Sequence, residues 1–175
     1  MEQKKNKLLS DMIQNDTDKK MVQLVEAATD LSCGDICTLL EVAHSLPFVG
    51  NLEGGDTYIN VLTREKESMV IAQYRHPNYD LYKRSIIGEI ERREDEPAVY
   101  RALEEGISGR GLIGIIDEGR TVVRHTVSPI LNSEKKVIGA LTYEYPNAGA
   151  DTESIRIITV SYTHLRAHET SLHLV

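Results

Sequence analysis

Two cysteines, Cys33 and Cys37, are the first side chains in this sequence whose type and spacing could do chemistry. A helix would bring both thiols to one face, where they could act in redox chemistry or hold a metal ion. Redox and zinc motifs usually space their cysteines as C-x₂-C, and a zinc site needs a second pair of ligands, which the sequence lacks. We therefore interpret the pair as half-buried free thiols in a reducing compartment. A redox or metal sensor is the alternative.

Other catalytic patterns are absent from the sequence. Residues 109–114 are rich in glycine, but they have neither the spacing of a dinucleotide-binding loop nor the ending of a P-loop. No Ser-His-Asp order and no nucleophile elbow occur. The segment from Glu89 to Glu105 holds seven carboxylates and three arginines, which is typical of a solvated face. We expect no catalytic residue in this chain.

Polar residues inside aliphatic strands remain as candidates for a binding site, because they could orient a small ligand in an apolar pocket. Alternation places Tyr58 and Asn60 on one face of one strand, and Gln73 and Arg75 on one face of the next. Arg84 follows near the expected entrance to the sheet and could hold an anion. We predict that these five residues contact a ligand, the alternative being that they face solvent.

His164 and His168 have the spacing of a metal-binding pair on a helix. However, the tail that contains them, residues 161–175, resembles translated sequencing-adapter read-through. We interpret the tail as non-native and predict no metal site and no cofactor in this chain.

The composition indicates one domain with an aliphatic core. The chain has 175 residues, is 41% hydrophobic and only 5% aromatic, and carries a net charge of −7. The negative charge argues against a nucleic-acid surface and against an anionic membrane as partners. The sequence has neither a membrane-spanning apolar run nor a signal peptide, so we expect a cytoplasmic protein.

Periodicity and turn residues predict a mostly antiparallel sheet with flanking helices, which is an α+β fold. Pro47 should end or kink the second helix near Leu46, and Pro97 should lie in the first turn of a short helix that stops at Gly106. The predicted elements, in chain order, are helices at 17–28 and about 32–46, a loop at 50–55, a hairpin at 58–62 and 69–74, a β-like run at 85–87, the helix after Pro97, a flexible loop at 108–111, a short strand at 112–116, a second hairpin at 121–131 and 137–145, and a helix from Asp151.

The chain divides into four parts on this interpretation. Residues 1–16 form a polar N-terminal arm, and residues 17–148 form the domain itself. Residues 149–160 begin a linker helix, and residues 161–175 are the tail.

Three blocks of sequence, in a fixed order, resemble one protein family. They are LSCGDICTLLEVAHSLPFVGNLEGGDTYINVLTRE, YKRSIIGEIERREDEPAVYRALEEG and RTVVRHTVSPILNSEKKVIGALTYE. Together they resemble the N-terminal sensor domain of bacterial two-component sensor histidine kinases, which carry a GAF/PAS-like input domain before the kinase core. The resemblance covers residues 31–144 and implies a GAF/PAS-like fold.

The resemblance also implies a function, which is the reception of a small-molecule or protein signal for a histidine kinase, in a chain truncated before the kinase core. The full-length parent would be a homodimer that uses ATP and Mg²⁺ to phosphorylate a histidine and passes the phosphate to a response regulator. His125 lies in a predicted strand without the family's phosphoacceptor string, so it is not expected to be that histidine. The alternatives are a stand-alone ligand-binding module or adaptor and a cysteine-based redox protein.

Overall fold

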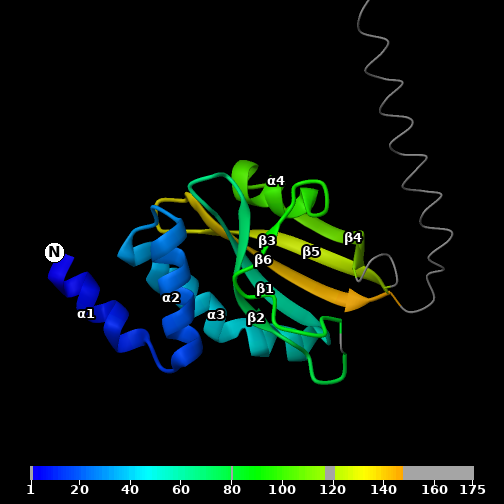
Figure 1. The fold of residues 1–175 in the computed structure, drawn as a ribbon, viewed down its shortest axis with the longest axis horizontal. Coiled ribbons are helices and arrows are strands. Elements are labelled where there is room, and N and C mark those ends of the chain that lie inside the picture. The colour runs from blue at the N-terminus through cyan, green and yellow to red at the C-terminus, as the bar shows by residue number, and fades with distance from the viewer. Residues whose placement is uncertain (1, 80, 117–120, 148–175) are drawn as a thin grey trace, which may run out of the picture.

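Six strands form one antiparallel sheet in the structure, a computed structural model that describes residues 2–79, 81–116 and 121–147. The strands are β1 (Asp56–Leu62), β2 (Ser68–Tyr74), β3 (Ile90–Glu91), β4 (Gly109–Ile116), β5 (Thr121–Leu131) and β6 (Val137–Pro146). Their order across the sheet is β3-β2-β1-β6-β5-β4 (Figure 1). Both predicted hairpins, β1–β2 and β5–β6, are confirmed, and so is the α+β class.

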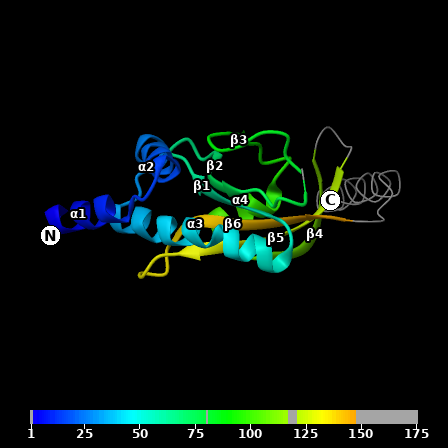
Figure 2. The ribbon, with the colours of Figure 1, turned by 90° about the horizontal axis from the view of Figure 1, so that it is seen from below.

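Three helices precede the sheet: α1 (Glu2–Met12), α2 (Asp16–Ala28) and α3 (Cys33–Glu53). The helices α1 and α2 lie at the end of the molecule away from β4, and α3 runs from that end along one face of the sheet (Figures 1 and 2). Their apolar side chains share one core with those of β1 and β2, including Val25, Leu39, Ile59 and Ile71. This core fixes one face of the central strands and leaves their alternate residues on the other face.

The helix starts follow ordinary capping chemistry. The side chain of Asn15 caps α2 by accepting a hydrogen bond from the backbone N–H of Asp18. Ser32 and Asp35 form a capping box at the start of α3.

Of the two alternatives predicted for Pro47, that it ends the second helix or that it kinks it, the first is wrong, because α3 continues to Glu53 and Gly54 ends it in the left-handed conformation. The predicted loop at 50–55 is therefore mostly helical. Leu46 and Gly50 are buried on this last part of the helix. A Cβ at Gly50 would lie 2.6 Å from the Tyr74 ring, so the helix packs closely on β2 here. This packing outweighs the lost proline donor.

The short helix α4 (Pro97–Glu105) covers the other face of the sheet. Pro97 occupies its first position and Gly106 ends it with φ 68°, as predicted. Val99, Ala102 and Leu103 pack on Val127 of β5 and Ala140 of β6.

The segment before α4 differs from the expected β-like run at 85–87. The chain turns at Gly88, whose φ is 93°, and the backbone N–H of Gly88 donates to the carbonyl of Val70. Only Ile90 and Glu91 then pair with β2 as strand β3. The predicted loop at 108–111 also differs, since β4 already begins at Gly109 and a bulge precedes Leu112.

Some predictions lie outside the described residues. They are the helix from Asp151, the linker at 149–160 and the tail at 161–175. Within the described parts of the chain, no helix combines the length and the apolar character needed to span a bilayer.

Candidate functional site

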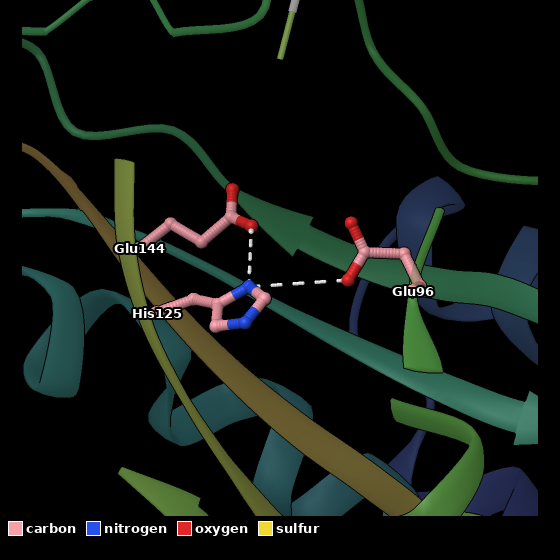
Figure 3. Close-up of side chains that lie close together, drawn as sticks. All are labelled: Glu96, His125 and Glu144. Atoms are coloured by element: carbon pink, nitrogen blue, oxygen red, sulfur yellow. Dashed lines mark ion pairs between the residues drawn. The ribbon is translucent and has the colours of Figure 1, made fainter. Parts of the chain in front are cut away.

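The candidate site lies on the sheet face opposite α2 and α3, where β5 and β6 meet the start of α4. His125 of β5 and Glu144 of β6 are direct cross-strand partners. Nδ1 of His125 lies 3.7 Å from Oε1 of Glu144 and 3.9 Å from Oε2 of Glu96. Figure 3 shows the His125 ring between the two carboxylates. We call Glu96, His125 and Glu144 the Glu-His-Glu cluster.

Two tyrosines orient the fully buried carboxylate of Glu144. The hydroxyl of Tyr58 donates to Oε1 at 3.0 Å, and the hydroxyl of Tyr82 donates to Oε2 at 2.6 Å. Burial, followed by the nearby charge of Glu144, raises the pKa of both tyrosines. Both hydroxyls therefore remain protonated donors at physiological pH, and they fix the direction of the carboxylate.

A third carboxylate, that of Glu91 in β3, is held beside the cluster. Its Oε2 accepts hydrogen bonds from Asn60 Nδ2 at 2.6 Å and from Ser68 Oγ at 3.3 Å. The Tyr100 hydroxyl donates to the backbone carbonyl of Glu91 at 2.8 Å and so ties this segment to α4. Burial raises the pKa of Glu91 to about 7, and the charge of Glu144 adds to the shift.

Glu96 occupies the N-cap position of α4, yet its side chain makes no capping hydrogen bond. Instead it turns toward the His125 ring (Figure 3). Burial raises its pKa to about 9, with the charges of Glu144 and Glu91 as further causes. A carboxyl group in this position holds a proton at neutral pH unless a cation or a ligand donor takes the place of that proton.

Several buried polar atoms of this region have no hydrogen-bond partner. They include Nδ1 of His125, Oε2 of Glu96, Oδ1 of Asn60 and Oγ1 of Thr142. Buried polar groups are nearly always paired in native proteins, so a concentration of unpaired ones points to a missing partner. Together they offer mostly acceptor atoms, which suits a ligand that is a cation or a hydrogen-bond donor.

A pocket of about 300 Å³ opens beside the cluster. Its lining includes Tyr82, Ile86, Glu91 and Glu96. Tyr82 and Glu96 also contact Glu144 and His125, respectively, so the pocket adjoins the cluster. The volume is enough for a small ligand.

The structure places the five predicted ligand-binding residues in different surroundings. Tyr58 and Asn60 lie at the site, where their side chains donate hydrogen bonds to Glu144 and Glu91, respectively. Gln73 lies on the same side and accepts a hydrogen bond from the backbone N–H of Ile86.

The two predicted arginines lie apart from the cluster. Arg84 is exposed and forms an ion pair with Glu89, which lines the pocket. Arg75 is exposed and lines a separate hollow of about 320 Å³ together with residues 76–79. The structure therefore brings Tyr58 and Asn60 together at the cluster and leaves Arg75 outside it.

Sequence reasoning missed the central residues of the site. The expectation that the whole run from Glu89 to Glu105 is a solvated face is wrong for Glu91 and Glu96, which turn inward. Other members of the run do face solvent, since Arg93 pairs with Glu104 and stacks on Tyr100. One pattern in the sequence could have indicated the site, which is an ionisable residue in each strand of the second predicted hairpin, His125 in the first strand and Glu144 in the second.

The cysteine pair lies on the opposite side of the sheet, within α3. Neither cysteine forms a disulfide, and Cys37 is buried in the helical core. Burial and the neighbouring Cys33 raise the pKa of the Cys37 thiol. A raised pKa lowers the thiolate fraction, which does not favour a nucleophilic cysteine.

Comparisons with known proteins show which family and which solved structures this chain resembles. The family model for the GAF domain of histidine kinase PdtaS matches residues 21–163. The sensor region of a sensor histidine kinase is similar in structure, with a TM-score of 0.57 and 17% identity over 75% of this chain and 43% of that chain. A phycocyanobilin-bound GAF domain from a cyanobacterial phytochrome gives a TM-score of 0.42 and 13% identity over 93% of this chain and 100% of that one.

The structural likeness to the sensor region shows a shared fold, and this chain spans less than half of that protein's length. No curated protein sequence shows a significant match to the chain.

Proposed function

The chain belongs to the family of histidine kinase PdtaS GAF domains, and on this premise we propose that it is the signal-receiving input domain of a cytoplasmic two-component histidine kinase. The signal would be a small ligand that enters the pocket beside the Glu-His-Glu cluster. The kinase core would lie in the rest of the parent protein, where ATP and Mg²⁺ bind. The parent would act as a homodimer and pass phosphate to a response regulator.

The proposal depends on one observation, which is a set of buried, unpaired acceptor atoms beside a pocket that Glu96 lines. Nδ1 of His125 and Oε2 of Glu96 are buried without a partner. Leaving such groups unpaired costs about 1–3 kcal/mol each. A ligand that pairs with them recovers this free energy only when bound, so its binding selects the arrangement that pairs them.

The cluster is also well placed to pass on a change. It joins three separate parts of the chain, since Glu96 begins α4, His125 lies in β5 and Glu144 lies near the end of β6. A ligand that draws these residues together would move α4 relative to the β5–β6 hairpin. The chain continues from β6 toward its C-terminus, so the end of β6 would carry the shift. A difference of about 1–3 kcal/mol between two states is enough for regulation.

A domain exchange tests the proposal. Residues 21–163 would replace the GAF domain of a PdtaS histidine kinase, and autophosphorylation with ATP would be measured for the chimera. We expect Glu144→Gln to change the rate, because it alters the charge at the centre of the cluster. The matched control is Glu65→Gln, which changes an exposed carboxylate in the β1–β2 turn.

The two outcomes are clearly separated. A rate that changes with Glu144→Gln and not with Glu65→Gln supports a sensory role. A rate that stays the same for both variants, and also when the domain is deleted, contradicts it.

A further inference from the structure

We propose that Glu96, His125 and Glu144 form a binding site for a divalent transition-metal ion such as Zn²⁺, with an open coordination position toward the pocket. The cluster offers one imidazole nitrogen and two carboxylate oxygens. Mixed nitrogen and oxygen ligands of this kind suit first-row transition metals better than Mg²⁺ or Ca²⁺, which prefer oxygen alone. That this ion is the signal of the kinase rests on the proposed function. That the three residues bind an ion does not depend on that function.

The distances between the ligand atoms fit an ion of this size. One ligand atom from each residue lies within 4.8 Å of the other two. The separations from Nδ1 of His125 are 3.7 Å and 3.9 Å. Ligands at about 2.0–2.2 Å from a tetrahedral zinc are about 3.4 Å apart, so the two separations from Nδ1 exceed this spacing by only about 0.3–0.5 Å. Three protein ligands leave the fourth position open.

An independent observation points to a ligand at this position. His125 is only 6% exposed, and its Nδ1 is aimed between the two carboxylates without a hydrogen-bond partner (Figure 3). Oε2 of Glu96, which lies 3.9 Å from this nitrogen, is also buried and unpaired. Proton sharing between ring and carboxylate would need a distance near 3 Å, and both distances are too long for that. An ion between the three groups would pair both atoms at once.

The surroundings are built like a metal site. Glu144 carries hydrogen bonds from Tyr58 on Oε1 and from Tyr82 on Oε2, which orient the carboxylate. His125 and Glu144 lie on paired strands, so the backbone ladder holds two of the three ligands in register. Glu96 comes from a different element, which allows the site to close on an ion. Glu91 adds a further carboxylate nearby that favours a cation.

Zinc binding by the full chain tests this inference. Cys33 and the tail histidines could bind zinc elsewhere, so the background protein carries Cys33→Ser, His164→Gln, His168→Gln and His173→Gln. Isothermal titration with Zn²⁺ should show one site per chain. His125→Gln and Glu96→Gln should each weaken binding at least about tenfold. His44→Gln, which changes a histidine on α3 away from the site, should not weaken it.

A second measurement protects the test against misfolded variants. Co²⁺ should give visible absorption bands of a tetrahedral or five-coordinate ion in the background protein, and Zn²⁺ should remove them. Circular dichroism would confirm that each variant is folded. The inference is overturned if Zn²⁺ does not bind, or if it binds to His125→Gln and Glu96→Gln as tightly as to the background protein. It is also overturned if the melting temperature of the protein rises with an added organic cation and does not rise with Zn²⁺.

The metal inference and the proposed function can fail separately. If Zn²⁺ does not bind but Glu144→Gln still alters the chimeric kinase, the sensory role stands with a different ligand. If Zn²⁺ binds and the chimera ignores both the metal and the variant, the site exists but the sensory role fails.

Discussion

His125 and Glu144 face each other directly across the β5–β6 hairpin, with Nδ1 of the ring 3.7 Å from Oε1 of the carboxylate. This pairing places an ionisable pair on the buried face that also carries Val127 and Ala140. The two tyrosines and Glu96 then enclose the pair from β1, the segment before β3 and the start of α4. The site is therefore a product of sheet register.

Removing the tyrosine donors should destabilise the protein. Tyr82→Phe deletes the 2.6 Å hydrogen bond to Glu144 and leaves Oε2 of a buried carboxylate without its donor. We expect a loss of about 1–3 kcal/mol in the free energy of unfolding, measured by urea denaturation. Tyr79→Phe, at a residue 40% exposed, is the control and should change it by less than about 0.5 kcal/mol. Equal stabilities for the two variants would contradict the role assigned to Tyr82.

Stability should fall as the pH rises from about 5 to 9. The folded protein has raised pKa values at Glu91, about 7, and at Glu96, about 9, so it holds protons that the unfolded chain has already released. Rising pH therefore favours the unfolded state, by about 1.4 kcal/mol per pH unit for each proton held. The slope should be steeper below pH 7, where both groups contribute, than between pH 7 and 9.

Thermal unfolding at a series of pH values measures this slope. Glu96→Gln should flatten it, most clearly above pH 7, while Glu94→Gln at an exposed neighbour should leave it unchanged. A wild-type protein as stable at pH 9 as at pH 5, with metal removed by a chelator, would show that Glu96 is not buried as described.

Replacing the proline inside α3 should stabilise the protein. Pro47→Ala restores a backbone donor in a helix that continues to Glu53, and alanine has the higher helix propensity. We expect a gain of about 1–3 kcal/mol in the free energy of unfolding, measured by chemical denaturation. Ser45→Ala, at an exposed site of the same helix, is the control with a smaller expected gain. A loss of stability with Pro47→Ala would mean that the helix ends at the proline.

Two glycine substitutions should differ clearly in their effect on the free energy of unfolding. A Cβ at Gly55 would collide with the backbone carbonyl of Glu144, so Gly55→Ala should cost more than about 2 kcal/mol and disturb the cluster. Gly34 lies in the first turn of α3, and its added Cβ would meet only Ser32 Oγ at 3.7 Å. Gly34→Ala should therefore be neutral or stabilise by up to about 1 kcal/mol. Urea denaturation of both variants checks the difference, and a harmless Gly55→Ala would refute the close approach of β1 to β6.

The sequence predicted the two hairpins of the sheet but not the register of their strands. Hydrophobic alternation and turn residues located both hairpins. A simple count across the turn, with Leu131 opposite Val137, would place His125 opposite Tyr143. A bulge between Ile130 and Leu131 shifts the pairing by one residue, so that Glu144 becomes the partner. A shift of one residue moves side chains to the other face, and bulges leave little trace in a sequence.

The acidic segment shows a second limit of prediction from sequence. Carboxylates are usually exposed, so the run from Glu89 to Glu105 fits a solvated face. Glu91 turns inward because Asn60 and Ser68 of the facing strands donate hydrogen bonds to it. Both donors lie far from Glu91 along the chain, so the local pattern could not reveal them. Strand alternation is a local property, so it could place Tyr58 and Asn60 on one face of a strand, and both side chains are buried there.

The central claim is that the Glu-His-Glu cluster is where this GAF domain receives its signal. The autophosphorylation rate of the chimeric kinase carrying His125→Gln, compared with the same kinase carrying His44→Gln, tests it most directly. The account predicts a rate that departs from wild type by at least about threefold for His125→Gln, equivalent to about 0.7 kcal/mol, and no change for His44→Gln. Identical rates in folded proteins, at every concentration of added Zn²⁺, would contradict it.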